Sequence, residues 1–241
     1  MTATRLIAQE DSYIQKFQAA VVDIDSENRG LIVDQTAFYP GGGGQPCDVG
    51  TFTVEGHLFP VIKVKKIGDQ VIHFIEGEMP LPAPGTPIEG QIDWERRYQL
   101  MRTHTALHIL CGVVFRDYGA LVTGGDMDPL KGRMDFEFET MHKELVQQIE
   151  QAVNSEVAQS RPVLVKVLPR EEAFQIPDLI RTKINLLPEG IQQVRTVEIA
   201  GLDLQADGGT HVRNTAEVGL IRVIDYKSKG KINKRIYIEL D

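Results

Sequence analysis

Four residues in two short motifs could together hold a metal ion. His104 and His108 lie four residues apart in the run Arg-Thr-His-Thr-Ala-Leu-His, and Asp207 and His211 show the same spacing in Asp-Gly-Gly-Thr-His. Positions i and i+4 of a helix share one face, so two imidazoles at this spacing can bind one ion. His211, in a glycine-containing loop, could supply a third nitrogen, and Asp207 could supply a fourth ligand or a general base.

The histidine pair by itself leaves two interpretations open. It could be half of a metal site, or two half-buried histidines that line an amphipathic helix. The Asp-Gly-Gly-Thr-His loop favours the metal site, because zinc sites combine histidine nitrogen with carboxylate or thiolate, and catalytic ones pair the protein ligands with water. With Zn²⁺ as the predicted cofactor, the expected chemistry is hydrolysis, since the ion lowers the pKa of bound water toward about 7 and can polarise a carbonyl.

The sequence around these motifs predicts a domain that mixes helices and strands. Apolar residues recur every three or four positions from Trp94 to about Phe115, which predicts a helix that carries both histidines. A second helix is predicted over Met141–Gln159, with Thr140 as its N-cap. Strands are predicted at 133–139, 163–168, 193–199, 218–225 and 232–240. This order favours an α+β architecture with a mostly antiparallel sheet.

The first eighty residues, in contrast, predict β-structure alone. Short apolar runs are separated by glycine-containing turns, at 19–25, 30–34, 51–54, 59–65 and 70–75. Such regular spacing is typical of a small barrel or a curled sheet. Four prolines between Pro80 and Pro87 indicate a stiff linker, and a short strand is predicted after it at 89–93. We therefore predict two domains, a β-rich one over residues 1–88 and an α+β one over residues 89–241.

Composition narrows the class of protein. The chain has 241 residues, 25% of them charged, and a net charge of −8 at pH 7. These values suit a globular protein and argue against a general nucleic-acid binder. Two cysteines are too few for a disulfide framework, and no apolar stretch approaches the roughly 20 residues that span a membrane, so a cytoplasmic location is expected. The lysine-rich segment 227–235 could still contact phosphates, or protect a solvated strand edge.

A run of four glycines in Tyr39-Pro-Gly-Gly-Gly-Gly-Gln-Pro-Cys-Asp48 is the other unusual feature. A backbone without Cβ atoms can approach a substrate or another segment closely, so we expect this tract to lie against the cleft of the second domain. The alternative is a flexible hairpin tip. A phosphate-binding P-loop is disfavoured, because the Lys-Ser/Thr pair of that motif is missing and no clear helix follows.

Four motifs, taken in order, resemble those of one protein family. They are Pro40–Asp48, Arg102–His108, Arg133–Phe136 and Gly208–Gly219. The chain resembles the free-standing alanyl-tRNA editing proteins of the AlaX family, medium-length type, and is similar to the editing domain of alanyl-tRNA synthetase. The resemblance implies a small N-terminal β domain followed by a zinc-dependent editing domain. It also implies a partner, tRNA(Ala) mischarged with serine or glycine, and an activity, hydrolysis of the aminoacyl ester, which corrects errors that one binding pocket cannot prevent.

The resemblance further implies which residues bind the metal. His104, His108 and His211 match the histidine ligands of the family, whereas Asp207 stands where the family pattern has cysteine. An aspartate oxygen is a harder ligand than a thiolate, though zinc accepts it. Asp207 could therefore be a fourth ligand, or a group that orients water or takes its proton. Alternatively, the replacement of cysteine by aspartate could abolish metal binding.

Leu107 is a second departure, at a position where the synthetase domain has threonine. Thr105 and Thr210 remain as candidate catalytic hydroxyls beside Asp207. Contacts with substrate or tRNA are predicted from Gly41, Gly42, Gly43, Gly44, Gln45, Arg102 and Arg133.

The basic residues near the motifs have two possible roles. Arg96, Arg97 and Lys131 could join Arg102 and Arg133 in binding phosphates of the acceptor stem, or all of them could form salt bridges. Two other functions also stay open. The chain could be a non-catalytic aminoacyl-tRNA-binding protein that keeps the editing fold, or a metallohydrolase that acts on another small ester or amide.

Overall fold

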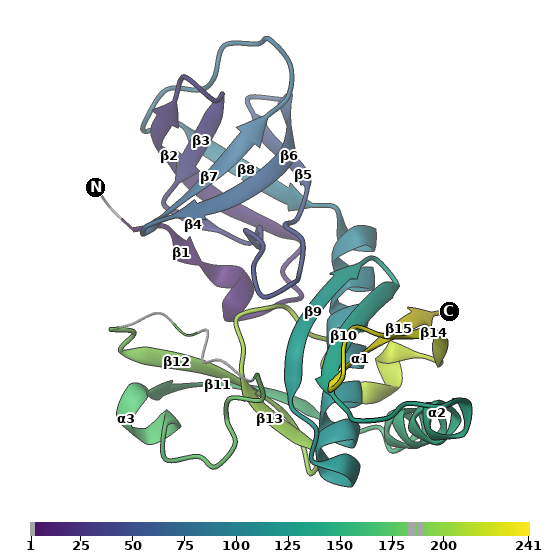
Figure 1. Cartoon of the computed structure of the whole chain (residues 1–241). Helices are drawn as coiled ribbons and strands as arrows, with labels where there is room; N and C mark the ends of the chain where they lie inside the picture. The colour runs from purple at the N-terminus through teal and green to yellow at the C-terminus, as the bar shows by residue number, and fades with distance from the viewer. Residues whose placement is uncertain (1–2, 183–186, 188–189) are drawn as a thin grey trace. The chain divides into compact units, whose positions relative to one another are not determined.

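The computed structural model describes residues 3–182, 187 and 190–241, and the chain divides into two compact units (Figure 1). The first unit is Met1–Gln99 and the second is Leu100–Asp241. Within the sheets of the described residues, every strand pairing is antiparallel except that of the short strands β1 and β4. The predicted α+β class with mostly antiparallel sheet is therefore confirmed.

A closed antiparallel barrel forms the core of the first unit. Its strands follow the order β2-β3-β7-β6-β5-β8. Their bounds are β2 Lys16–Asp25, β3 Gly30–Val33, β5 Gly50–Val54, β6 His57–Ile67, β7 Gln70–Ile75 and β8 Pro87–Ile92. Outside the barrel, β1 (Arg5–Leu6) pairs with β4 (Gln35–Thr36), and η1 (Ile7–Gln9) is a 3-10 turn. Each β run predicted in the first eighty residues overlaps one barrel strand, which confirms the predicted small barrel.

Aromatic side chains fill the interior of the barrel. Phe17, Phe38 and Phe52 pack edge to face, with ring centroids 5.4 to 6.2 Å apart. This geometry adds to the roughly 1.5–3 kcal/mol gained by burying each ring. Gly90 on β8 leaves the room that Phe17 occupies, because a Cβ there would lie 2.3 Å from the ring. Even alanine at this position would displace the ring.

Strand β8 closes the barrel through antiparallel pairing with β2 and β5. The sequence predicts a strand at 89–93 that opens the second domain, whereas the structure pairs this strand within the first unit. The proline-rich segment before it, residues 80–86, contains neither helix nor strand. Hydrogen bonds to strands far away in the sequence decide this assignment, and local composition does not reveal them.

Arg97, in the first turn of α1 (Trp94–Tyr118), is held inside the first unit. Its side chain is fully buried and donates to the Asp48 carboxylate, to the Ser12 carbonyl at 2.9 Å and to the Ala37 carbonyl at 2.6 Å. Such a network stabilises a buried charge, since removing one partner of a buried ion pair costs about 3–5 kcal/mol. Arg97 therefore has a structural role and is no exposed contact for phosphates.

His73 on β7 is a buried histidine with a partner at each ring nitrogen. Nε2 lies 2.8 Å from the Thr36 hydroxyl, and Nδ1 lies 3.0 Å from the Leu31 carbonyl. Burial lowers the pKa of His73 from 6.5 to about 4. The ring is therefore neutral at pH 7, and His73 is an ordinary core histidine of the barrel.

We expect His73 to make the folded chain sensitive to acid. Below about pH 6.5 the unfolded chain takes up a proton that folded His73 accepts only near pH 4, so the free energy of unfolding falls as the pH falls through this window. The loss amounts to about 3 kcal/mol. Urea denaturation at pH 7 and at pH 4 should show a pH dependence smaller by about that amount for His73→Gln than for the wild type. Equal pH dependence in the two proteins would contradict this expectation.

The second unit contains a four-stranded sheet, a three-stranded sheet and helices among its described residues (Figure 1). The first sheet follows the order β14-β15-β10-β9, with β9 Val122–Asp128, β10 Lys131–Glu137, β14 Ile221–Ser228 and β15 Asn233–Leu240. The second follows β11-β12-β13, with β11 Val163–Pro169, β12 Gln193–Ile199 and β13 Asp203–Ala206. The helices are most of α1, α2 Lys143–Ala158, α3 Arg170–Ala173 and the 3-10 turn η2 Thr215–Val218. None of the described helices is both long and apolar enough to cross a membrane.

The N-cap of α2 is His142, so the prediction of Thr140 is wrong. The His142 ring accepts the Leu145 N–H at 3.3 Å, which satisfies one of the free donors at the start of the helix. No sequence pattern predicts β9 or β13, because two adjacent glycines interrupt β9 and β13 is four residues long.

The strand predicted over 218–225 begins later, at Ile221. A 3-10 turn precedes it, because Asn214 and Glu217 form a reciprocal capping box. The Asn214 side chain accepts the Ala216 N–H at 2.8 Å, and the Glu217 carboxylate accepts the Asn214 N–H at 3.1 Å. These side-chain bonds favour a turn at residues whose apolar character alone predicts a strand.

Candidate metal centre

Helix α1 brings His104 and His108 together, as their spacing predicts. Both rings are buried, and their centroids lie 5.0 Å apart. The ring of His211 stacks on that of His104 at 4.2 Å and meets that of His108 edge-on at 4.7 Å. Two segments far apart in the sequence thus contribute three histidines to one cluster within the second unit.

Asp207 lies where the Nε2 atoms of the three histidines converge. Its carboxylate is 3.0 Å from His211 Nε2, 3.6 Å from His104 Nε2 and 4.0 Å from His108 Nε2. With one ligand atom taken from each residue, the four atoms lie within 4.8 Å of one another. Imidazole nitrogens and a carboxylate oxygen form a donor set that zinc accepts, so these residues fit a divalent metal ion.

Backbone contacts hold Asp207 at the end of β13. The Asp207 N–H donates to the Arg195 carbonyl at 3.1 Å, and the Arg195 guanidinium donates to the Asp207 carbonyl at 2.9 Å. The two carboxylate oxygens have different neighbours. Oδ2 accepts the Gly209 N–H at 2.7 Å and lies nearest His211, whereas Oδ1 is the oxygen nearer the two α1 histidines. This arrangement leaves Oδ1 to serve as a ligand while the loop fixes Oδ2.

Burial keeps two of the histidines in the neutral form that binds metals. It lowers the pKa of His211 from 6.5 to about 4, and that of His104 well below its usual value. Burial also acts to lower the pKa of His108, but the carboxylates of Asp203 and Asp207 outweigh it and raise that pKa. Burial favours the protonated form of Asp207, yet the neighbouring histidines hold its pKa well below the ordinary value. The cluster therefore offers an ionised carboxylate at neutral pH.

The Thr105 hydroxyl contacts one of the candidate ligands. It lies 3.1 Å from His211 Nδ1, and the side chain is fully buried. This contact helps set which nitrogen of His211 faces the cluster. Thr210, the other candidate hydroxyl, is also fully buried. Leu107 is buried too, and its side chain packs on Gly132 of β10.

Sequence reasoning misses Asp203, which contacts the cluster through His108. Its carboxylate is fully buried and lies 3.3 Å from His108 Nδ1. Burial alone would raise the pKa of Asp203, but the contact with His108 holds it below the ordinary value. Asp203, Gln205 and Asp207 alternate along the segment that begins with β13, and alternate residues of a strand share one face. This period-two pattern of polar residues is the signal that could have found Asp203.

The two predicted tRNA-contacting arginines lie outside the four-residue cluster and have protein partners. Arg102 donates to the Val218 carbonyl at 2.9 Å and to the Asp241 carbonyl at 2.6 Å. Arg133 on β10 lies 3.4 Å from the Asp126 carboxylate, and its side chain is 30% exposed. Arg102 is thus engaged with backbone carbonyls, whereas part of the Arg133 side chain is accessible to solvent.

The glycine tract of the first unit forms a hydrogen-bonded turn. Gly41–Gly44 all have positive φ, from 60° to 138°, a conformation that other residues rarely adopt. Gly42 and Gln45 exchange two backbone hydrogen bonds, of 3.0 and 2.9 Å, and the Tyr39 hydroxyl donates to the Gly42 carbonyl at 3.1 Å. Gln45 is 3% exposed, so its side chain is not available at the surface. The expectation that this tract lies against the cleft of the second domain stays a prediction.

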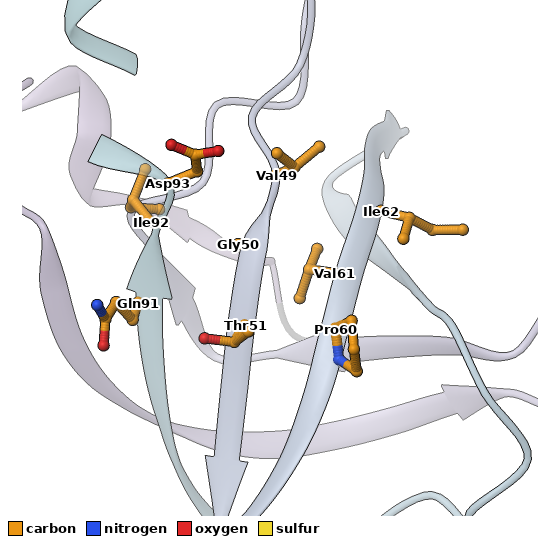
Figure 2. Close-up of a pocket in the computed structure, with 9 residues that line it drawn as sticks. All are labelled: Val49, Gly50, Thr51, Pro60, Val61, Ile62, Gln91, Ile92 and Asp93. Carbon is orange, nitrogen blue, oxygen red and sulfur yellow. The ribbon is translucent and has the colours of Figure 1, made fainter. Parts of the chain in front are cut away.

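Figure 2 shows a shallow hollow on the wall of the barrel, between β5, β6 and β8. Its lining consists of Val49, Gly50, Thr51, Pro60, Val61, Ile62, Gln91, Ile92 and Asp93. Asp93 is the one ionisable side chain in this lining, and no candidate ligand belongs to it. Among these residues, the side chains that could bind a metal or take part in a reaction are those of the cluster in the second unit.

Comparison with known proteins connects these features to one family. Residues 6–96 match the model of class II (A) tRNA synthetases, and residues 194–237 match the model of the second additional domain of threonyl and alanyl tRNA synthetases. The chain is 36% identical over 234 residues to the alanyl-tRNA editing protein AlaX-M of Methanosarcina barkeri. This match covers 95% of the chain and 96% of the relative. It is also 40% identical to AlaX-M of Saccharolobus solfataricus over 230 residues, and this match covers 95% of each chain.

A similarity to a much longer enzyme is consistent with this result. The alanine–tRNA ligase of Pyrobaculum aerophilum is 37% identical over 227 residues, which are 91% of this chain and 25% of the ligase. The match therefore spans nearly the whole chain but one quarter of a synthetase. Because the similarity to these editing proteins extends over both units and over at least 95% of each relative, the chain belongs to the AlaX-M family of alanyl-tRNA editing proteins, as its four motifs predict.

Proposed function

We propose that this chain is a zinc-dependent deacylase that hydrolyses the aminoacyl ester of tRNA(Ala) mischarged with serine or glycine. The observation that carries the proposal is the convergence of three imidazole nitrogens on the Asp207 carboxylate, within 4.8 Å of one another, in a chain of an editing family. Donors of this kind suit zinc, and hydrolytic zinc sites keep one coordination position for water. We place the reaction in the cytoplasm.

Each residue of the cluster has a proposed role. His104, His108 and His211 would hold the metal through Nε2, and Asp207 would be a further ligand through Oδ1, with a coordination position left for water. When bound there, the ion activates a water molecule and polarises the ester carbonyl. Thr105 orients His211 through its contact with Nδ1 at 3.1 Å. The burial of these side chains strengthens their electrostatic effect on the reacting ester, because little solvent surrounds them.

The proposed reaction is a hydrolysis. Water adds to the acyl carbon, the bond from that carbon to the ribose oxygen breaks, and the ribose oxygen takes up a proton. The products are the free amino acid and uncharged tRNA(Ala). Serine and glycine each differ from alanine by one small group, which a single binding pocket discriminates poorly, so a second hydrolytic site improves fidelity.

Contacts with tRNA are proposed from both units. Arg133, whose side chain is 30% exposed, would contact phosphate directly. The turn Gly41–Gly44 would contact the substrate through its backbone. Gln45, which is buried, and Arg102, which is bonded to backbone carbonyls, would support the segments around them.

The test is deacylation of Ser-tRNA(Ala), Gly-tRNA(Ala) and Ala-tRNA(Ala), each with and without a chelator. We expect the two mischarged tRNAs to lose their amino acid faster than Ala-tRNA(Ala). Activity should disappear with the chelator and return when zinc is added, because the cluster needs its ion.

Two other results would change the assignment. Binding of tRNA without hydrolysis of any of the three substrates would indicate a non-catalytic aminoacyl-tRNA-binding protein, an alternative that Asp207 in place of cysteine permits. Hydrolysis of free amino-acid esters without hydrolysis of charged tRNA would indicate a metallohydrolase with another substrate.

A further inference from the structure

The two ring nitrogens of His108 have different surroundings. Nε2 faces the Asp207 carboxylate at 4.0 Å, among the candidate metal ligands. Nδ1 is buried, and within the part of the chain that the structure describes it forms no aligned hydrogen bond. A carboxylate is nevertheless within reach, because Asp203 Oδ2 lies 3.3 Å from Nδ1. A buried polar atom left without a partner costs about 1–3 kcal/mol, so this carboxylate is the natural acceptor for an Nδ1–H.

Asp203 is itself held by two partly buried partners. The Gln205 amide donates to Oδ2 at 2.6 Å, and Arg181 Nε donates to Oδ1 at 3.3 Å. The guanidinium of Arg181 packs over Phe115 of α1, 3.9 Å from the centre of the ring, which limits its movement. The Asp203 side chain has no exposed surface. A carboxylate anchored at both oxygens is a rigid partner for a neighbouring imidazole.

The other members of the cluster have different surroundings. His211 Nδ1 lies 3.1 Å from the neutral Thr105 hydroxyl, and Asp207 Oδ2 accepts the Gly209 N–H and lies 3.7 Å from the Arg195 guanidinium. His108, in contrast, has a full negative charge beside its far nitrogen. Such a charge fixes the tautomer of a ligating histidine and raises the basicity of the nitrogen that faces the metal.

We propose that Asp203 is a positioning residue for the metal centre. It accepts the Nδ1–H of His108, holds the tautomer whose Nε2 lone pair faces the cluster, and so raises the affinity of the site for zinc. This inference rests on the metal site of the proposed function and adds to it a residue outside the four candidate ligands. Outer partners of this kind typically change metal affinity 10- to 100-fold.

The first test is the zinc affinity of Asp203→Asn, measured without tRNA by competition with a chromophoric chelator. Asparagine keeps the size of the side chain and removes its charge, so we expect affinity to fall about 10- to 100-fold. Asp128→Asn, an exposed position at the end of β9, is the matched control and should bind zinc as the wild type does. In a His108→Ala background, Asp203→Asn should cause no further loss. An equal loss there would mean that Asp203 does not act through His108, and would overturn the proposal.

A second measurement uses the wild type and so does not depend on how the variant folds. Nitrogen NMR of histidine-labelled protein with zinc bound should show a proton on Nδ1 of His108 and none on Nε2. The opposite tautomer, or unchanged zinc affinity in Asp203→Asn, would overturn the proposal. A wild type that binds no zinc would overturn it as well. If both expected results are obtained but the wild type deacylates no mischarged tRNA, the proposed function is removed and this inference stands.

Discussion

The His104→Ala/His108→Ala variant is expected to purify without zinc and to deacylate mischarged tRNA(Ala) no faster than buffer does. These side chains supply two of the three candidate nitrogen ligands, and their rings lie 5.0 Å apart on one helix. The remaining His211 and Asp207 are too few to hold zinc tightly, since zinc sites in proteins use three or four side chains. The fall in zinc affinity should exceed the roughly 100-fold fall that can follow loss of a residue that contacts a ligand but not the metal. Elemental analysis and a deacylation assay on one preparation measure both effects.

Controls assign this loss to the metal site. Circular dichroism of the double variant should match that of the wild type, because the substitutions leave the helix-forming character of α1 intact. His57→Ala removes an exposed histidine of the barrel unit and should retain full zinc and full activity. If the double variant keeps its zinc, the metal binds elsewhere in the chain.

Asp207→Ala is expected to weaken zinc binding substantially and to slow deacylation with it. Oδ1 of Asp207 lies 3.6 Å from His104 Nε2 and 4.0 Å from His108 Nε2, while Oδ2 accepts the Gly209 N–H. This geometry supports a carboxylate that binds the ion through one oxygen. Asp207→Cys restores the donor that the family pattern has at this position, so this variant should retain zinc and part of the activity. Zinc titration and single-turnover deacylation compare the three proteins.

Two other outcomes would assign Asp207 a different role. If Asp207→Ala keeps its zinc and turns over slowly, the carboxylate orients the attacking water or takes its proton. If zinc affinity and rate both stay at the wild-type level, Asp207 has neither role. The chelator competition used for Asp203→Asn applies here without change, so the effects of the two aspartates can be compared directly.

Local patterns in the sequence predict the elements that carry the site. The apolar period of α1 and the alternating runs of the barrel arise from backbone geometry over a few residues, so they are visible without the fold. The placement of His104 and His108 on one helix face follows from the same geometry. The end of the barrel is less visible, because pairing of β8 with β2 and β5 decides it. Arg97 shows the same limit of local patterns. A basic residue beside the motifs suggests a phosphate contact, but the folded chain buries Arg97 in an ion pair with Asp48.

The sequence by itself determined the chemical types of the donors, the helix that holds two of them and the family motifs. Only the tertiary structure decided which atoms converge. His211 meets Thr105 across 106 residues of sequence, and Asp207 is held by the backbone of β12. Asp203 enters the site because β13 pairs with β12 and buries its carboxylate beside His108. Distances and burial of this kind arise only when distant segments pack together. The spacing of the candidate ligands is visible in the sequence, whereas the alternation of Asp203, Gln205 and Asp207 marks one face of a strand without showing that Asp203 lies beside His108.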